Sequence, residues 1–375
     1  MKKKILILNY GLHISGVSRT LINFANILAK NGYDVTIQLE VNDFTLAKEL
    51  DSRIRCKLLI DEWHIFGRRV RGFLRFYELY RRILFHFSAS LQYRFTVHEK
   101  YDVEIAFNRG AAARIISAST NKESKKLAWV HNDYMRNSNP IAGFSSLEEA
   151  SKAYSKFDHV ICVSNQAEIA FKQKFGDTRN VTTRYNIIDI NRIMQCAAEK
   201  KIPTNNFTIV AVGRLCEQKN YKLLLDAAAE LVRRNRDFSL WIVGDGEQKQ
   251  ELLEYRDKLN LKQVTFWESQ ENPYPFFSAA DLYVSSSIYE GLSTTTIEAL
   301  ILGKPIVVTD CTGMRDIIGD NKCGTIVPFS ANSLADAIER MIIDEKFRKY
   351  CMAQALIRAK RFAPEKNFKE IEELI

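Results

Sequence analysis

Short apolar runs rich in isoleucine and valine alternate with helical patterns along the whole chain. Those before residue 165 are Ile5–Leu8, Val35–Leu39, Val103–Phe107, Leu127–Val130 and Val160–Val163. Few of them alternate apolar and polar positions, and strands that are apolar throughout are typical of a parallel sheet covered by helices on both faces. Between the first two runs, Val17–Asn31 has helical apolar spacing and is followed by Gly32, which predicts a capped helix.

The same pattern starts again after residue 205. The later runs are Phe207–Val212, Leu240–Val243, Val264–Trp267, Leu282–Val284, Ile306–Val308 and Thr325–Val327. Helical patterns are expected between most of them, over 220–234, 247–259, 294–302 and 331–343. Two successive arrays of this kind predict an α/β fold of two doubly wound, Rossmann-like domains.

The length of 375 residues also favours two domains, since one domain usually takes about 150 residues. The polar stretch over 191–206 is the best candidate linker. We therefore expect an N-terminal domain over 1–190, a C-terminal domain over 207–355, and a C-terminal helix over 356–375 that could return to the N-terminal domain.

Composition narrows the class of protein. With 46% hydrophobic and 26% charged residues, the chain resembles an ordinary soluble globular protein. Seven scattered cysteines without a CxxC motif give no support to a disulfide framework or a zinc ribbon. The apolar run near the N-terminus is too short for a signal peptide, and no stretch approaches a membrane span. We expect a cytoplasmic protein, or one peripheral on the inner face of the plasma membrane.

The first candidate for chemistry follows a predicted strand of the second half. Gly213 and Arg214 end that strand, and Lys219 comes five residues later. Two cations beside a glycine at the carboxyl end of a strand suit a phosphate or diphosphate. A solvated loop would explain this pair of cations equally well.

A second candidate lies in the segment Tyr289–Leu300, where seven residues separate Glu290 from Glu298. Ser293 is a good N-cap, and the free amides of a helix N-terminus bind anions. Glu298 would lie about a turn further along, where a carboxylate can accept hydrogen bonds from vicinal hydroxyls. A glutamate in a helix is usually only solvated, but this pair lies among apolar residues.

In this order and spacing, Gly213-Arg214…Lys219, the loop Val243–Glu247 and Glu290-x7-Glu298 resemble the retaining glycosyltransferases of family 4, which have the two-domain GT-B fold. The resemblance is of the bacterial surface-polysaccharide type. It continues through Leu302–Asp310 and is strongest over 205–330. The first half is similar more loosely, through Gly11–Gly16 and Trp129–Asp133.

The resemblance implies a role for each matching residue. Arg214 and Lys219 would neutralise a nucleotide diphosphate, Glu298 would hold the ribose, and Glu290 would lie near the hydroxyls of the donor sugar. Gly16 would let the N-terminal backbone approach the diphosphate, and His131 would lie near the reacting sugar unless its role is structural. The implied catalytic residues are Glu290, His131, Arg214 and Lys219. The implied donor-binding residues are Gly16, Gly213, Arg214, Lys219, Glu290, Gly291, Leu292, Ser293, Thr294 and Glu298.

The resemblance also implies the substrates, a nucleotide-diphosphate sugar and a glycan or lipid-linked acceptor. The N-terminal domain would be the acceptor side. A UDP-sugar is favoured, although Glu268 replaces a residue that is usually glycine at the strand end that contacts the base. No Asp-x-Asp occurs, so we expect no metal and no other cofactor. No carboxylate is obviously placed as a nucleophile, which favours front-face substitution.

Other functions remain as alternatives. A nucleotide-sugar epimerase could have the same fold, whereas a dehydrogenase lacks a complete G-x-G-x-x-G motif. The net charge of +9 could indicate a nucleic-acid-binding protein, but no signature of such a protein accompanies it, so we expect no nucleic-acid partner.

The charge is concentrated between Gly67 and Arg94, where seven arginines face one acid, Glu78. Aromatic residues are interleaved with these arginines, which is typical of an element that lies on anionic lipid. The alternative is that the aromatic residues pack onto the domain and the arginines are merely solvated. The candidate contacts with an anionic membrane surface are Arg68, Arg69, Arg71 and Arg75.

Overall fold

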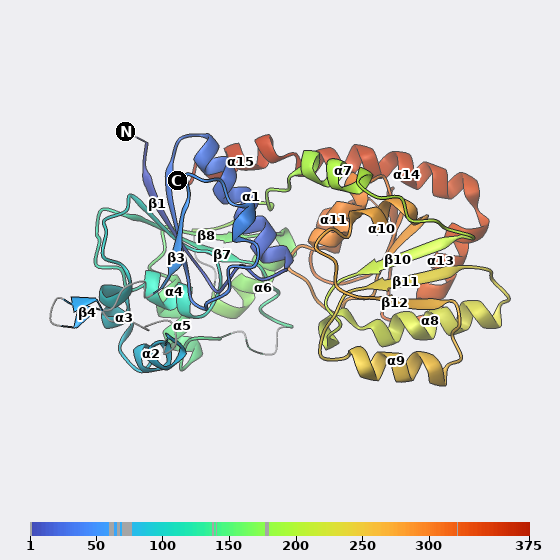
Figure 1. The fold of residues 1–375 in the computed structure, drawn as a ribbon, viewed down its shortest axis with the longest axis horizontal. Helices are drawn as coiled ribbons and strands as arrows, with labels where there is room; N and C mark the ends of the chain where they lie inside the picture. Colours follow the sequence, from blue (N-terminus) through green and yellow to red (C-terminus); the bar gives the residue numbers. More distant parts are fainter. Residues whose placement is uncertain are drawn as a thin grey trace. The chain divides into compact units, whose positions relative to one another are not determined.

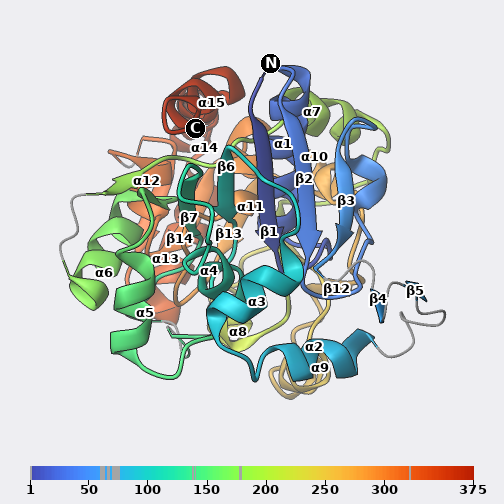
Figure 2. The same cartoon turned by 90° about the vertical axis from the view of Figure 1, so that its left-hand side faces the viewer.

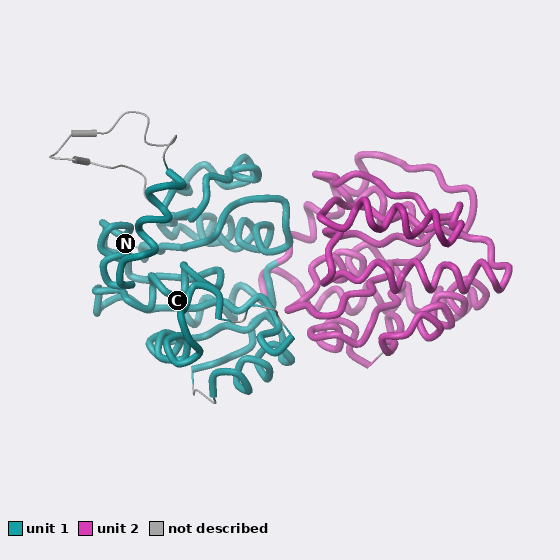
Figure 3. The backbone as a smooth tube through the Cα atoms, turned by 90° about the horizontal axis from the view of Figure 1, so that it is seen from below, with its two compact units in different colours: residues 1–187, 367–375 teal, residues 188–366 magenta. Residues whose placement is uncertain are grey.

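The computed structural model describes residues 2–59, 64–65, 68–69, 77–136, 139, 141–176, 180–320 and 322–375. The chain forms two compact units (Figure 3). Unit 1 contains Met1–Ile187 together with Asn367–Ile375, and unit 2 contains Ile188–Lys366. No helix among the described residues has the length and apolar character needed to cross a bilayer.

Unit 1 is built on a parallel sheet of seven strands in the order β3-β2-β1-β6-β7-β8-β9. The central strand β1 is buried from Ile5 to Leu8, as expected for a sheet covered on both faces (Figure 1). The strands are β1 Lys4–Asn9, β2 Asp34–Leu39, β3 Arg55–Leu58, β6 Val103–Ala106, β7 Lys125–Val130, β8 His159–Cys162 and β9 Val181–Thr183.

The helices of unit 1 begin with α1, Gly16–Lys30, whose N-cap Ser15 accepts a hydrogen bond from the amide of Ser18. Its buried face includes Leu21 and Phe24, at the spacing that predicted this helix. The other helices are α2 Tyr77–Leu84, α3 Ala89–Thr96, α4 Ala111–Ile116, α5 Leu147–Tyr154 and α6 Asn165–Phe175. A short ribbon pairs β4, His64–Ile65, with β5, Arg68–Arg69.

Unit 2 repeats this architecture with six parallel strands in the order β12-β11-β10-β13-β14-β15. The strands are β10 Thr208–Val212, β11 Ser239–Val243, β12 Val264–Trp267, β13 Leu282–Ser285, β14 Ile306–Thr309 and β15 Gly324–Val327. The helices are α7 Ile190–Ala198, α8 Tyr221–Arg233, α9 Lys249–Lys258, α10 Tyr274–Ala279, α11 Thr294–Ile301, α12 Met314–Ile318, α13 Ala331–Ile343 and α14 Glu345–Ala359. Figure 1 shows α10 and α11 on one side of this sheet and α8 on the other. Two doubly wound α/β units are therefore confirmed.

The boundaries between the units differ from the sequence-based ones. The segment 191–206, expected to be a linker, contains most of α7, which belongs to unit 2. This helix buries Ile193 and Ala197, and the side chain of Asn272 donates a hydrogen bond to the carbonyl of Cys196 at 2.8 Å. Most of the polar residues that suggested a linker follow the helix, from Glu199 to Asn206.

The C-terminal residues also differ from the single helix expected over 356–375. Helix α14 ends at Ala359, and a new helix, α15, spans Pro364–Glu372. Proline fits the first turn of a helix but not its interior, so Pro364 favours a break at this point. The last residues belong to unit 1, where Lys3 Nζ donates to the backbone oxygen of Ile375 at 2.7 Å.

Candidate functional site

The strand order identifies where a ligand can bind in each unit. In unit 2 the strand order reverses between the neighbours β10 and β13, because β11 and β12 follow on the side of β10 whereas β14 and β15 follow on the side of β13. In unit 1 the same reversal lies between β1 and β6. Loops that leave the carboxyl ends of such neighbours run in opposite directions and leave a crevice between them. The residues after β10 and β13 in unit 2 include most of the candidates from the sequence.

Glycines let the loop after β10 lie unusually close to the loop after β11. The amide of Leu215 donates to the carbonyl of Asp245 at 2.9 Å. A Cβ on Gly244 would lie 2.0 Å from the carbonyl oxygen of Gly213, and one on Gly246 would lie 2.4 Å from that of Leu215. Because Gly244 and Gly246 have no side chains, the two loops can pack backbone against backbone on both sides of Arg214.

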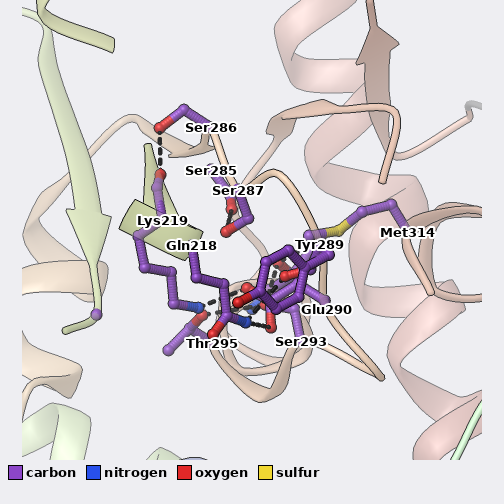
Figure 4. A network of polar contacts seen from close by, with 12 residues as sticks. Gln218, Lys219, Ser285, Ser286, Ser287, Tyr289, Glu290, Ser293, Thr295 and Met314 are labelled. Carbon is purple, nitrogen blue, oxygen red and sulfur yellow. Dashed lines mark hydrogen bonds and ion pairs between the residues drawn. The ribbon is translucent and has the colours of Figure 1, made fainter. Parts of the chain in front are cut away.

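The two cations expected to bind phosphate have different environments. Arg214 is exposed, and no carboxylate of the described residues lies within ion-pair distance of its guanidinium. Lys219 ends a short 3-10 turn, Glu217–Lys219, and its Nζ lies 2.6 Å from Glu290 Oε1 (Figure 4). The solvated-loop alternative therefore does not describe Lys219.

Electrostatics favour the charged form of Lys219. Burial opposes its ammonium charge, but the attraction of Glu290, with a smaller contribution from Tyr283, holds the pKa of Lys219 above its ordinary value. Both side chains of the ion pair are largely shielded, with 19% of the Lys219 side chain and 10% of the Glu290 side chain exposed. The pair therefore carries a cation and an anion in one protected place.

Further contacts tie the turn before Lys219 to the loop after β13. Gln218 Nε2 donates to the carbonyl of Tyr289 at 2.9 Å and lies 3.5 Å from Glu290 Oε2. The hydroxyl of Ser286 donates to the carbonyl of Lys219 at 2.9 Å. Figure 4 shows Gln218 and Lys219 both directed at Glu290. Sequence reasoning missed Gln218 and Ser286, for which the only signal was that Gln218 precedes a candidate lysine.

The start of α11 supplies the third part of the site. Ser293 caps this helix by accepting a hydrogen bond from the amide of Thr296 at 3.4 Å, so the expected N-cap is confirmed. Within the described chain, the backbone amides of Leu292, Ser293 and Thr294 have no hydrogen-bond partner. Gly313 allows close packing here, because a Cβ on it would lie 2.4 Å from the carbonyl oxygen of Gly291.

Glu298 lies within α11 and is buried, with 7% of its surface exposed. Its Oε1 accepts a hydrogen bond from the hydroxyl of Tyr274 on α10 at 3.3 Å. Glu298 is therefore not a solvated surface glutamate.

The strand end expected to contact a base follows β12. The amide of Gly244 donates to the carbonyl of Trp267 at 3.0 Å. The carboxylate of Glu268, the unusual residue at this position, lies 2.6 Å from Lys249 Nζ. Its charge is therefore compensated by Lys249 on α9.

The other candidates from the sequence lie in unit 1. Gly16 is the first residue of α1, and His131 directly follows β7. Burial lowers the pKa of His131 to about 3, although a hydrogen bond with the backbone of Phe107 partly opposes this effect. The imidazole is therefore neutral at physiological pH, and its Nε2 is buried without a hydrogen-bond partner in the described structure.

Most of the candidate membrane contacts lie outside the part of the chain that the structure describes. Arg71 and Arg75 lie outside the described residues, and of Arg68 and Arg69 only the backbone, in β5, is described. Across the described ranges, no three His, Cys, Asp or Glu side chains gather in a way that could hold a metal ion.

Comparisons with known proteins identify relatives of both halves. A family model described as glycosyl transferases group 1 matches residues 195–358, and one described as glycosyltransferase family 4 matches residues 14–192. An uncharacterized glycosyltransferase of Methanocaldococcus jannaschii is 32% identical over 308 residues, which cover 70% of this chain and 74% of the relative.

A shorter match of 181 residues is 36% identical to the N-acetylgalactosamine-N,N'-diacetylbacillosaminyl-diphospho-undecaprenol 4-alpha-N-acetylgalactosaminyltransferase of Campylobacter jejuni, and spans 48% of each chain. Among solved structures, Anabaena HepE in complex with UDP and glucose superposes with a TM-score of 0.76 at 21% identity, over 99% of this chain and 98% of that one. This likeness shows that the two chains share the GT-B fold.

Proposed function

Because the chain belongs to the family 4 glycosyltransferases, we propose that it transfers a sugar from a nucleotide-diphosphate sugar to an acceptor hydroxyl with retention of the anomeric configuration. The observation that carries this proposal is the shielded contact between Lys219 and Glu290, 2.6 Å long, at the strand-order reversal of unit 2. It offers a cation for the diphosphate and a carboxylate for the sugar hydroxyls.

Three features of unit 2 stabilise the leaving diphosphate. Lysine has three N–H donors, so Lys219 can keep its bond to Glu290 while it donates to a phosphate oxygen. The guanidinium of Arg214, which no described carboxylate pairs with, provides a second cation, and the backbone amides at the start of α11 add donors for an anion. Groups fixed in advance around a charge that grows in the transition state lower the activation barrier.

Two buried glutamates serve the neutral parts of the donor. Glu298 accepts hydrogen bonds from the ribose hydroxyls, and Glu290 accepts them from the donor sugar. Because Glu290 Oε1 contacts the ammonium group of Lys219, Glu290 serves as a hydrogen-bond acceptor for hydroxyl groups, and no covalent intermediate is invoked. The reaction is a front-face substitution, in which the departing phosphate takes the proton of the acceptor hydroxyl.

Unit 1 contributes to the acceptor side in this proposal. Gly16, at the start of α1, brings backbone to the diphosphate without a side chain. The neutral imidazole of His131 exchanges hydrogen bonds with the reacting sugar.

The relatives support a particular donor and acceptor. UDP is the favoured nucleotide, which agrees with the UDP bound in the Anabaena structure. A lipid-linked acceptor is favoured because the Campylobacter relative is named for a diphospho-undecaprenol substrate. With such an acceptor, the enzyme works on the inner face of the plasma membrane.

The first experiment identifies the donor. A ligand that binds only the folded protein raises its stability, by about 2.7 kcal/mol at a hundred times Kd. UDP-, GDP- and ADP-sugars are compared by thermal shift, and a UDP-sugar is expected to give the largest rise. Incubation of the donor alone, followed by sugar analysis, tests for the epimerase alternative. A panel in which no nucleotide sugar shifts the melting temperature would contradict the proposal.

The second experiment tests the chemistry of the leaving group. Arg214→Ala and Lys219→Ala remove cations whose interactions strengthen in the transition state, so kcat is expected to fall by about 100-fold or more. Lys258→Ala, on the exposed end of α9, is the matched control and is expected to leave kcat unchanged. Turnover in EDTA tests metal independence, and activity lost in EDTA but restored by Mg²⁺ would refute that part of the proposal.

A further inference from the structure

Five large apolar side chains, spaced four residues apart, are exposed along α2, α3 and the turn between them. Leu79 and Phe95, at the two ends of this series, are 54% and 53% exposed. The rings of Phe87 and Phe95 are 5.9 Å apart, so part of the series forms one continuous surface. Figure 2 shows α2 and α3 following one another at one end of unit 1. We call the five residues the α2–α3 ridge: Leu79, Ile83, Phe87, Leu91 and Phe95.

The ridge is not needed to hold these helices in place. Tyr77 of α2 is buried and donates a hydrogen bond from its hydroxyl to the carbonyl of Glu40 at 2.7 Å. Tyr93 of α3 is buried and donates to Glu104 Oε1 at 2.8 Å. Because both helices are anchored through other side chains, the apolar area of the ridge remains available to a partner. Exposed apolar patches of this kind mark interaction surfaces.

The charged side chains next to the ridge are three arginines and two glutamates, which leaves a small positive excess. Arg81 is ion-paired with Glu40 at 3.0 Å and with Glu78 at 2.8 Å. By contrast, the neighbouring Arg82 and Arg94 are exposed, and no carboxylate in the described ranges forms an ion pair with either. The ridge therefore combines exposed apolar side chains with two arginines that no described carboxylate pairs with.

We propose that the α2–α3 ridge docks unit 1 on the surface of an anionic lipid bilayer. Apolar side chains enter the boundary between headgroups and acyl chains, while arginines beside them meet anionic headgroups. A second copy of this chain fits less well, because a twofold interface at the ridge would bring Arg82 and Arg94 of one copy near the same cations of the other. This inference is independent of the proposed transfer reaction.

The test measures sedimentation of the full chain with vesicles of phosphatidylglycerol and phosphatidylcholine, without any donor. Binding is expected only with phosphatidylglycerol at low salt, and release is expected at high salt. Each basic residue near such a surface changes affinity about fivefold, so the double variant Arg82→Gln/Arg94→Gln is expected to bind about 30-fold more weakly.

Two apolar double variants test α2 and α3 separately. Leu79→Ser/Ile83→Ser and Leu91→Ser/Phe95→Ser are both expected to weaken vesicle binding at least tenfold. The substituted side chains are exposed, so folding is expected to persist, and thermal melting checks it. Matched controls in the same unit are Ile169→Ser, 56% exposed, for the apolar change, and Lys122→Gln/Lys156→Gln for the charge change. These controls are expected to bind as the wild type does.

A site-specific readout separates docking from general adsorption. Tryptophan introduced by Phe95→Trp is expected to be quenched by brominated lipid, whereas tryptophan introduced by Ile169→Trp is not. Failure of the wild type to bind phosphatidylglycerol at low salt would overturn the proposal. So would ridge variants that bind like the wild type, equal binding to both lipids, or self-association that the ridge variants abolish without any vesicle binding. Because no donor is present, a negative result here leaves the proposed transfer reaction to its own tests.

Discussion

At the scale of single residues, the contact between Lys219 and Glu290 joins positions 71 residues apart in the sequence. The sequence indicated a phosphate-binding lysine and a sugar-binding glutamate separately, but it could not predict that the two groups would meet. Local spacing predicts neighbours along one element, whereas this pair depends on two strands lying side by side in the sheet. Gln218 was missed for the same reason, since its partners come from the loop after β13.

The two glutamates are expected to differ in what their removal changes. Glu298→Ala is expected to weaken binding of both free nucleotide and donor about tenfold, because the ribose is common to both. Glu290→Ala is expected to leave nucleotide affinity nearly unchanged while kcat falls about 100-fold or more. Calorimetric titration with UDP and with the donor, beside turnover, measures both. Equal nucleotide affinity in the wild type and both variants would mean that Glu298 does not hold the ribose.

His131 shows how burial sets the state of a candidate catalytic group. The sequence placed it after an N-terminal strand, but it could not indicate the neutral form, which results from desolvation in the folded unit. A neutral imidazole can donate from one ring nitrogen and accept at the other.

The lowered pKa of His131 predicts a loss of stability in acid. The unfolded imidazole protonates near pH 6.5, and the folded one only near about pH 3. Between these values the unfolded state binds more protons, so the free energy of unfolding falls as pH decreases, by at most about 1.4 kcal/mol per pH unit. Denaturant unfolding at pH 7 and pH 5 is expected to show a drop that is about 2 kcal/mol smaller in His131→Asn than in the wild type. His98→Asn, at an exposed histidine, is the control, and an identical drop in all three proteins would contradict the assignment.

At the scale of elements, the loops that carry the site depend on glycines that accept no side chain. Gly213 and Gly244 belong to different loops, and their backbones touch because neither residue has a Cβ. The position of Arg214 is therefore fixed by backbone packing as well as by the end of β10.

Gly244→Ala is expected to disturb this packing. Its Cβ would lie 2.0 Å from the carbonyl oxygen of Gly213, so one of the two loops must move. We expect a melting temperature several degrees lower and donor binding at least tenfold weaker, measured by thermal shift with and without UDP. Gly176→Ala is the control, since φ at Gly176 is +91° and a Cβ there meets nothing within 4 Å. It carries only the backbone cost of about 1–2 kcal/mol and is expected to leave UDP affinity intact.

Most of the central elements could be predicted from the sequence, because buried parallel strands and amphipathic helices leave strong patterns. The expected helices over 331–343 and 220–234 correspond to α13, Ala331–Ile343, and α8, Tyr221–Arg233. The edge strands β3 and β9 were missed, since they are short and carry polar residues such as Arg55 and Thr182. A strand at the edge of a sheet is less buried and needs fewer apolar side chains. The apolar run that identifies a central strand is therefore missing from its sequence.

At the scale of the whole molecule, the chain passes from unit 1 to unit 2 and then returns. The returning residues are buried in unit 1, with Phe368 and Ile371 at most 5% exposed. The hydroxyl of Tyr33 donates to Glu372 Oε1 at 2.9 Å, and burial together with this carboxylate raises the pKa of Tyr33 to about 12. Residues 367–375 are thus a structural part of unit 1.

Removal of residues 367–375 is therefore expected to destabilise unit 1 selectively. The milder variant Ile371→Ala deletes a fully buried side chain and is expected to cost about 2–5 kcal/mol. Hydrogen exchange is expected to speed up in peptides from β1 and α1 but not in those from β10 and α8. Glu373→Ala, at an exposed neighbouring position, is the control. Equal acceleration in both units would contradict a local role for these residues.

The return of the chain also sets an order for folding during synthesis. A ribosome makes residues 1–187 first, yet unit 1 lacks residues 367–375 until all of unit 2 has been made. At about 5–20 residues per second, the roughly 180 residues of unit 2 take roughly 10–40 s to emerge. Unit 2 is continuous in sequence and needs no later segment, so it can be complete while unit 1 still waits. The unit that starts first is the one that finishes last.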